Sequence, residues 1–234
     1  MRTARFFVPE TWMAHTIQAF TIPAGPLHKQ IVSVLRLKAG DSLSLLTGNG
    51  KEADCLITEV NRSSIMGTIV QVTTSKPTTP QVVVCAAVTK KDTYEFVLQK
   101  CTELGASAFL PIISERVIKK PTEIPKRWHD IVREASEQSG RTTLPQLHEP
   151  RSFTQAFSFT EGMVRILMHE SGKQSVLPKV HKTSTIALFI GPEGGFTDKE
   201  VEVAQKHEFH VLTLGSLVLR AETAAIAGTA KLLL

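Results

Sequence analysis

The chain has 234 residues, of which 42% are hydrophobic and 21% are charged, and its formal net charge is +5 at neutral pH. This length allows one large domain or two small ones, and the apolar content excludes a disordered chain. The mild positive charge is compatible with an anionic partner such as RNA, but it does not identify one.

Residues 1–73 are predicted to be mostly β structure. The tripeptide Gly48-Asn49-Gly50 is a strong tight-turn signal, because glycine and asparagine tolerate positive φ. The apolar side chains of residues 26–36 recur at helical spacing, so we expect one helix beside a small barrel. Short apolar or alternating runs predict strands at residues 4–8, 42–46, 53–60 and 64–72.

A polar segment with two prolines, residues 73–80, is predicted to link this part to a second domain of residues 74–234. Beyond the linker, apolar runs alternate with helical patterns, which is typical of a parallel α/β sheet. Strands are expected at residues 81–88, 109–113, 163–168, 185–190 and 211–214. Helices are expected at residues 92–104, 125–139 and 221–234, and after the capping box of residues 197–200.

The cysteine pattern and the apolar runs exclude several classes of protein. Cys55, Cys85 and Cys101 show no CxxC or Cys/His spacing, so we expect reduced thiols in a cytoplasmic protein and no structural zinc. The first residues lack the apolar run of a signal peptide. No stretch approaches the roughly 18 apolar residues of a membrane span, so none is expected.

A glycine-rich turn, Gly191-Pro192-Glu193-Gly194-Gly195, separates the expected strand 185–190 from the capped helix. Ligands of α/β sheets bind beyond the carboxyl ends of the strands, and glycines there let the backbone approach a ligand closely. A plain strand-to-helix turn is the simpler interpretation, but the density of glycines beside a proline and a carboxylate favours a binding site. The spacing fits neither a P-loop nor a dinucleotide-binding fingerprint.

A second candidate loop follows the last predicted strand. Leu214-Gly215 is followed by an apolar stretch, and Arg220, Glu222 and Thr223 lie at the start of the final helix. Glu222 suits the positive end of the helix dipole, so simple capping would explain it. A cation at a helix N-terminus is electrostatically unfavourable. We therefore interpret Arg220 as a functional or partnered residue.

The two loops, GPEGGFTDKE (191–200) and LGSLVLRAETA (214–224), resemble the signature of the RsmE family of RNA methyltransferases. The segments MRTARFFV, HKQIVSVLRLKAGD, LQKCTELGA and EASEQSGR resemble the same family in the same order, so the resemblance covers nearly the whole chain. It implies a PUA-like, RNA-binding β-barrel in residues 1–73. It also implies a SPOUT methyltransferase domain with a C-terminal trefoil knot in residues 74–234, and a homodimer.

The family's activity is methylation of N3 of a uridine in 16S rRNA of the small ribosomal subunit, with S-adenosylmethionine as the methyl donor. The resemblance therefore implies this function for the chain, in the cytoplasm. The family often has a basic residue where this chain has Leu217, which removes one possible RNA-facing cation. By matching motif, the donor pocket is expected to be lined by Met168, His169, Ile190, Gly191, Pro192, Glu193, Gly194, Gly195, Leu214, Gly215, Leu217, Val218, Leu219, Arg220 and Thr223.

Three residues are candidates for the chemistry. Arg220 could stabilise the negative charge that develops on the uracil, and Glu193 or Glu222 could accept the N3 proton. The alternative is that both carboxylates only orient the loops. RNA contacts are expected from Arg2, Arg5, Arg36, Arg116, Arg133 and Arg141, whereas Lys119 and Lys120 are better explained as solvated surface charges. The histidines show no metal spacing, and His169 at a strand end is the first to examine.

Two other functions stay open. A different SPOUT enzyme could methylate a ribose 2′-hydroxyl, but such enzymes usually carry a Ser-Leu-Asn motif where this chain has Leu-Arg-Ala-Glu-Thr. A ribosome-assembly factor could combine a barrel with an inactive α/β domain. The intact glycine-rich and Leu-Arg-Ala-Glu-Thr loops argue against a non-catalytic factor.

Overall fold

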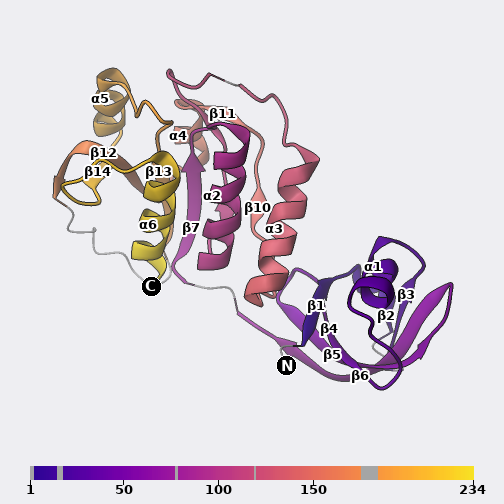
Figure 1. Ribbon diagram of the computed structural model, residues 1–234. Coiled ribbons are helices and arrows are strands. Elements are labelled where there is room, and N and C mark those ends of the chain that lie inside the picture. The colour runs from indigo at the N-terminus through magenta and orange to yellow at the C-terminus, as the bar shows by residue number, and fades with distance from the viewer. Residues whose placement is uncertain (1–2, 15–17, 77–78, 119, 175–183) are drawn as a thin grey trace. The chain divides into compact units, whose positions relative to one another are not determined.

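The computed structural model in Figure 1 describes residues 3–14, 18–76, 79–118, 120–174 and 184–234. The chain divides into two compact units. Unit 1 comprises Met1–Pro77 and Ser136–Leu144, and unit 2 comprises Thr78–Ala135 and Pro145–Leu234. A short piece of chain from the middle of the sequence therefore packs with the N-terminal unit.

Unit 1 contains a six-stranded sheet in the order β1-β4-β5-β6-β3-β2. The first strand pairs in parallel with β4, and every other neighbouring pair is antiparallel. The expected tight turn joins β4 to β5, and both of its glycines, Gly48 and Gly50, have positive φ. The strands are β1 (Ala4–Phe7), β2 (Met13–Ala14), β3 (Ala19–Pro23), β4 (Ser42–Leu46), β5 (Lys51–Val60) and β6 (Ser64–Thr74).

The helix expected at residues 26–36 is shorter and less regular than predicted. It begins as α1 (Pro26–Lys29) and continues as a π-helical turn, Gln30–Val34. Ile31 is the only residue of that turn that is buried in the core of the unit, where it joins fully buried Leu45 and Ile65. The β-branched side chains around Ile31 are stiff at χ1 and lower the helix propensity, which explains why the regular helix ends early.

Unit 2 contains a six-stranded sheet in the order β10-β8-β7-β13-β12-β14, and every neighbouring pair is parallel. This confirms the predicted parallel α/β sheet. A separate pair of parallel strands is formed by β9 (Ile112–Ile113) and β11 (Arg151–Ser152). The six strands are β7 (Gln81–Ala86), β8 (Ala108–Phe109), β10 (Gln146–Leu147), β12 (Val164–Gln174), β13 (Thr185–Ile190) and β14 (His210–Thr213).

The prediction of one strand at residues 109–113 is wrong. The chain leaves the large sheet after Phe109 and pairs with β11 only from Ile112 onwards. Pro111 lies at the break and has no N–H to donate to a sheet ladder, which is the physical reason for the change of sheet.

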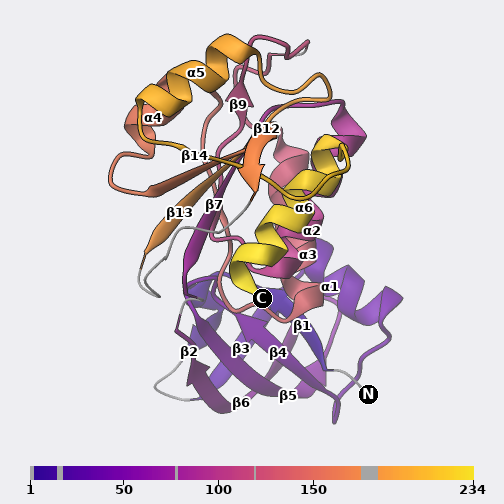
Figure 2. The same cartoon turned by 90° about the vertical axis from the view of Figure 1, so that its left-hand side faces the viewer.

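Helices cover both faces of the large sheet. Figure 2 shows α2 (Lys91–Leu104) and α6 (Ala221–Leu233) on one face, and α4 (Gln155–Phe159) and α5 (Asp198–Lys206) on the other. Because both faces are covered, the central strands β7 and β13 are buried. Their sequences are therefore nearly continuous apolar runs. The remaining helix is α3 (Lys126–Ser139). In the described part of the chain, no helix is long and apolar enough to cross a membrane.

The strand β12 runs past its expected end at Met168. Residues Ile166–Met168 pair with His210–Leu212, and after an irregularity Lys173 and Gln174 pair with Leu212 and Thr213. A Cβ on Gly172 would lie only 2.4 Å from the carbonyl carbon of Leu212, so this close approach requires glycine. The crossing brings residues after Met168 against the end of β14.

Candidate active site

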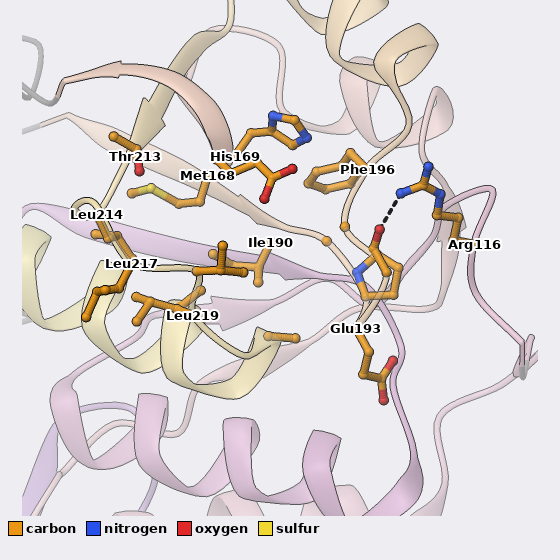
Figure 3. Close-up of a pocket in the computed structure, with 18 residues that line it drawn as sticks. Arg116, Met168, His169, Ile190, Glu193, Phe196, Thr213, Leu214, Leu217 and Leu219 are labelled. Atoms are coloured by element: carbon orange, nitrogen blue, oxygen red, sulfur yellow. Dashed lines mark hydrogen bonds between the residues drawn. The ribbon is translucent and has the colours of Figure 1, made fainter.

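A pocket lies at the carboxyl ends of the parallel strands β12, β13 and β14, where ligands of open α/β sheets bind (Figure 3). Its walls come from these strand ends, the loops after β13 and β14, the start of α6, and one arginine from the loop after β9. The lining residues are Arg116, Met168, His169, Glu170, Ile190, Gly191, Pro192, Glu193, Gly194, Gly195, Phe196, Thr213, Leu214, Leu217, Val218, Leu219, Ala221 and Ala224.

The glycine-rich sequence after β13 forms a tight turn in the pocket wall. The N–H of Gly195 donates to the carbonyl oxygen of Pro192 at 2.8 Å, and Gly195 has a φ of +69°. A Cβ on Gly191 would approach the backbone nitrogen of Phe196 to 3.0 Å. Glycine is therefore needed at Gly191 for the turn to fold back closely and at Gly195 for its left-handed backbone.

Apolar side chains form one side of the pocket. Met168, Ile190, Leu214, Leu217 and Leu219 gather there from three strand ends and one loop (Figure 3). Leu217 is 78% exposed, although burial of an aliphatic side chain is energetically favourable. Its neighbour Val218 is 81% exposed. Exposed apolar surface of this kind marks a place where a ligand or a partner binds.

Arg116 and Glu193 lie on the opposite side of the pocket (Figure 3). Nη1 of Arg116 donates to the carbonyl oxygen of Gly194. The carboxylate of Glu193 points away from the apolar side chains (Figure 3). Its Oε1 accepts a bond from the backbone N–H of Lys90, at 3.4 Å, next to the N-terminus of α2. An anion is stabilised there by the helix dipole. This geometry favours an orienting role for Glu193.

Most residues expected at the donor pocket are brought together in its wall, but three are not. Gly215, Arg220 and Thr223 are not among the described lining residues. Arg220 is exposed and is the N-cap residue of α6, directly before Ala221, which does line the pocket. The third catalytic candidate, Glu222, is half-buried in the first turn of α6 and also lies outside the lining.

Sequence reasoning missed six lining residues. Five of them are close neighbours in sequence of the predicted loops, and an extension of each motif by a few positions would have found them. No local pattern placed Arg116 in the pocket, because it lies on a loop far from both motifs in sequence. It was predicted to contact RNA instead. The six are Arg116, Glu170, Phe196, Thr213, Ala221 and Ala224.

The other arginines predicted to contact RNA have different surroundings. Arg2 lies outside the described residues. Nε of Arg5 pairs with Oε1 of Glu52 at 2.9 Å, whereas Arg36 is exposed with a φ of +56°. Arg133 is exposed on α3. Arg141 is half-buried, and burial lowers the pKa of its guanidinium to about 10.

Among the residues that the structure describes, neither histidine chemistry nor a metal centre stands out. Nδ1 of His169 lies 2.7 Å from the hydroxyl of Ser171 and accepts a bond from the Ser171 N–H, so the side chain takes part in a local turn. Within the described ranges, no group of three His, Cys, Asp or Glu side chains could hold a metal ion. Of the two lysines predicted to be solvated, Lys120 is exposed and Lys119 lies outside the described residues.

Comparison with known proteins gives the class and then the family. Residues 75–233 match the RNA methyltransferase domain family, and residues 31–70 match the RNA methyltransferase PUA domain family. Together with a parallel sheet that carries a pocket at its carboxyl edge, these matches define an RNA methyltransferase. The small-subunit ribosomal RNA methyltransferase E of Bacillus subtilis is 31% identical over 222 residues, 88% of this chain and 86% of that protein.

A second relative of the same name, from Synechocystis, is 33% identical over 91% of this chain and 72% of its own length. A crystal structure of the Neisseria gonorrhoeae protein of that name, bound to S-adenosylmethionine, superposes with a TM-score of 0.87. It shares 28% identity and covers 98% of this chain and 96% of its own. The chain belongs to the ribosomal RNA small subunit methyltransferase E family, the RsmE family of the sequence motifs.

Proposed function

We propose that this protein transfers a methyl group from S-adenosylmethionine to N3 of a uridine in 16S rRNA of the small ribosomal subunit. The observation that carries the proposal is the convergence of both signature loops on one pocket at the carboxyl ends of β12, β13 and β14. The relatives named above are small-subunit rRNA methyltransferases, and the Neisseria protein binds this donor.

The lining of the pocket fits this donor. The apolar side, with Met168, Ile190 and Leu219, suits the faces of an adenine ring. Gly191 and Gly195 bring backbone groups to the pocket wall, where they can hydrogen-bond to the polar edges of a ligand. When bound, S-adenosylmethionine supplies an electrophilic methyl group on a sulfonium. The residues of the chain then orient the donor and exclude water from it.

The acceptor nitrogen carries a proton that must be removed, and we propose that α6 supplies the groups for this. Arg220 precedes the pocket residue Ala221 and would stabilise the negative charge on the uracil carbonyl oxygens. Glu222, in the first turn of the same helix, would accept the N3 proton. The bond from Lys90 to Glu193 supports an orienting role for that third carboxylate.

The knot and the barrel are part of the proposal. A trefoil knot is supported by the path of β12, whose extension crosses the end of β14 at Gly172 while the chain after β14 returns as α6. In that return, the backbone at Gly228 comes close to Leu188 of β13 and Met168 of β12. Closure of the unit 1 sheet into a PUA-like barrel is supported by the family match within that unit.

We further propose that the active unit is a homodimer in the cytoplasm and that unit 1 binds RNA. The three successive apolar residues Leu217, Val218 and Leu219 are exposed in the single chain, which favours cover by a second copy together with the bound donor. Exposed Arg36 is the strongest candidate for an RNA phosphate contact in unit 1, because the guanidinium of Arg5 is already paired with Glu52.

Calorimetric titration with S-adenosylmethionine tests the proposal against a non-catalytic assembly factor. The purified protein should bind the donor with a dissociation constant in the micromolar range or below. A protein that shows no heat of binding at millimolar donor would contradict a methyltransferase. Activity on a ribose 2′-hydroxyl, the remaining alternative, is decided by the identity of the methylated nucleoside.

A further inference from the structure

A buried carboxylate lies behind the wall of the pocket. Glu200, in the first turn of α5, is only 9% exposed. Its Oε2 accepts the Thr197 N–H at 2.9 Å, which completes the capping box of the helix. Its Oε1 accepts the backbone N–H of Glu115 at 2.9 Å, from a loop 85 positions earlier in the chain. A capping box needs only one of these two oxygens, so the bond to Glu115 is not part of the cap.

The Glu115 loop is fixed at two further points. Ser114–Val117 closes as a turn, in which the Val117 N–H donates to the carbonyl oxygen of Ser114 at 3.2 Å. The hydroxyl of Thr197 lies 3.2 Å from Oε2 of Glu115 and 3.3 Å from Oε2 of Glu200, and its one hydrogen is shared between these two acceptors. Glu115 and Arg116 occupy the two corner positions of this turn. The start of α5 therefore fixes the point from which the Arg116 side chain leaves the backbone.

The guanidinium of Arg116 ends at the glycine-rich turn of the pocket. It donates to the carbonyl oxygen of Gly194, while the N–H of Gly195 donates to Pro192. The Gly194 carbonyl and the Gly195 N–H belong to one peptide group, which is planar and rigid. That peptide is therefore held at both ends. A Cβ on Gly194 would lie 3.3 Å from Cδ of Arg116, so glycine leaves room for the arginine stem.

We infer that Glu200 is a positioning residue for the donor pocket, and that it acts through the Glu115 backbone and Arg116 on the Gly194–Gly195 peptide. A turn with three glycines has an unusually large backbone entropy, which binding would otherwise have to overcome. The clamp orders the turn before the donor arrives. This inference rests on the proposed function, because it assumes that the pocket binds S-adenosylmethionine.

The alternative is that Glu200 only caps α5 and stabilises the fold. A double-mutant cycle with Glu200→Gln and Arg116→Ala separates the two roles. Glutamine keeps the volume, but its single acceptor oxygen can serve only one of the two N–H groups. Each single variant should weaken donor binding about tenfold, the value of one charged hydrogen bond. The double variant should bind within about twofold of Arg116→Ala alone, because both changes break the same chain of contacts.

Two further variants make the test specific. Asp198→Asn removes an exposed carboxylate from the same helix turn and should leave the dissociation constant for the donor unchanged. Glu115→Pro deletes the N–H that Glu200 accepts together with the carboxylate that faces the Thr197 hydroxyl, at a turn position that proline tolerates, and leaves the capping box intact. It should weaken donor binding about as much as Glu200→Gln, even if Glu200→Gln itself proves unstable. Guanidinium ions added to Arg116→Ala should restore part of the affinity.

The outcomes are distinct. Wild-type affinity in Glu200→Gln and Glu115→Pro, or losses that multiply in the double variant, would overturn the positioning role while the proposed function stands. A wild-type protein that does not bind S-adenosylmethionine would contradict the proposed function and this inference together. Thermal unfolding of every variant shows whether weakened binding is accompanied by loss of the folded state.

Discussion

At the residue scale, the three cysteines are free and buried. Burial raises the pKa of the Cys55 and Cys101 thiols to about 12, and it raises the pKa of Cys85 as well. Each pKa in the folded protein therefore exceeds the ordinary value of 9.0. The stability that comes from protonated thiols is fully present below pH 9 and is lost as the pH rises toward about 12.

Two measurements check this prediction. Denaturant unfolding at increasing pH should show a free energy of unfolding that falls above pH 9, and substitution of Cys101 by alanine should make the fall shallower. A thiol reagent at pH 8 should react with the cysteines only after unfolding, because the thiolate is the reactive form. Fast reaction of the native protein would contradict the buried positions.

We propose that Arg220 stabilises the negative charge that develops on the uracil during methyl transfer. Single-turnover methyl transfer by Arg220→Ala should be slower by about 100-fold, the typical effect of removing one group that stabilises a developing anion. Affinity for the donor should change little, because Arg220 lies outside the pocket lining. Arg151→Ala, which removes a cation stacked over Phe159, is the control and should transfer at the wild-type rate. Near-normal transfer by Arg220→Ala would remove its assigned role.

How far single residues could be predicted depended on whether their neighbours in sequence are also their neighbours in space. The glycines of the 191–195 turn were recognisable, because tight turns impose local requirements on the backbone. The place of Arg116 was not, because its partner Gly194 is 78 positions away in sequence. The orientation of Glu193 toward Lys90 likewise depends on a contact across 103 positions.

At the element scale, the crossing of β12 and β14 depends on Gly172. Gly172→Ala would place a Cβ 2.4 Å from the Leu212 carbonyl carbon, so the backbones of both strands must shift. We expect a loss of stability of about 3 kcal/mol or more, in the range of the severe steric substitutions. We also expect weaker donor binding, because Thr213 and Leu214 line the pocket. Denaturant unfolding and donor titration measure the two effects.

A matched substitution serves as the control. Gly25→Ala also adds one methyl group to a glycine, but no atom lies within 4 Å of the added Cβ. Its free energy of unfolding should fall by no more than about 1 kcal/mol, because Gly25 is the N-cap residue of α1 and alanine is a poorer N-cap than glycine. A Gly172→Ala protein as stable as Gly25→Ala would mean that the strands do not cross as described.

Elements with strong periodicity were predicted well, and those shaped by packing were not. Helix α2 ends at Gly105, and the capping box begins α5 as expected, because both signals are local. The extension of β12 past Met168 depends on a strand 40 or so residues later, and no local pattern encodes it. The two-residue strand β2 is too short to leave a pattern, whereas β3 was missed although its buried and exposed side chains alternate.

At the scale of the whole molecule, we propose that unit 1 binds RNA and that unit 2 binds the methyl donor. If Arg36 contacts a phosphate, Arg36→Ala should weaken RNA binding and reduce the slope of log affinity against log salt by about one. Arg5→Ala should have a smaller effect, because Glu52 already pairs with that guanidinium. Filter binding over a range of salt concentrations measures both slopes. Equal slopes for Arg36→Ala and the wild type would exclude a phosphate contact.

The division of the chain into compact units depends in part on contacts between segments far apart in the sequence. The change from β runs to alternating strands and helices marks the passage from one unit to the next. No local pattern predicts that Ser136–Leu144 belongs to the first compact unit. That association uses long-range contacts, such as the bond from the Phe7 N–H to Glu137 and the bridge between Gly48 and Thr143.

The most direct test of the central claim is the identity of the nucleoside that the protein methylates. Small ribosomal subunits from cells that lack the protein are incubated with the purified enzyme and S-adenosylmethionine labelled in its methyl group, and the 16S rRNA is digested and mapped by mass spectrometry. The account predicts label in 3-methyluridine at one site and none without the protein. Label on a ribose 2′-oxygen, or no transfer at all, would contradict it.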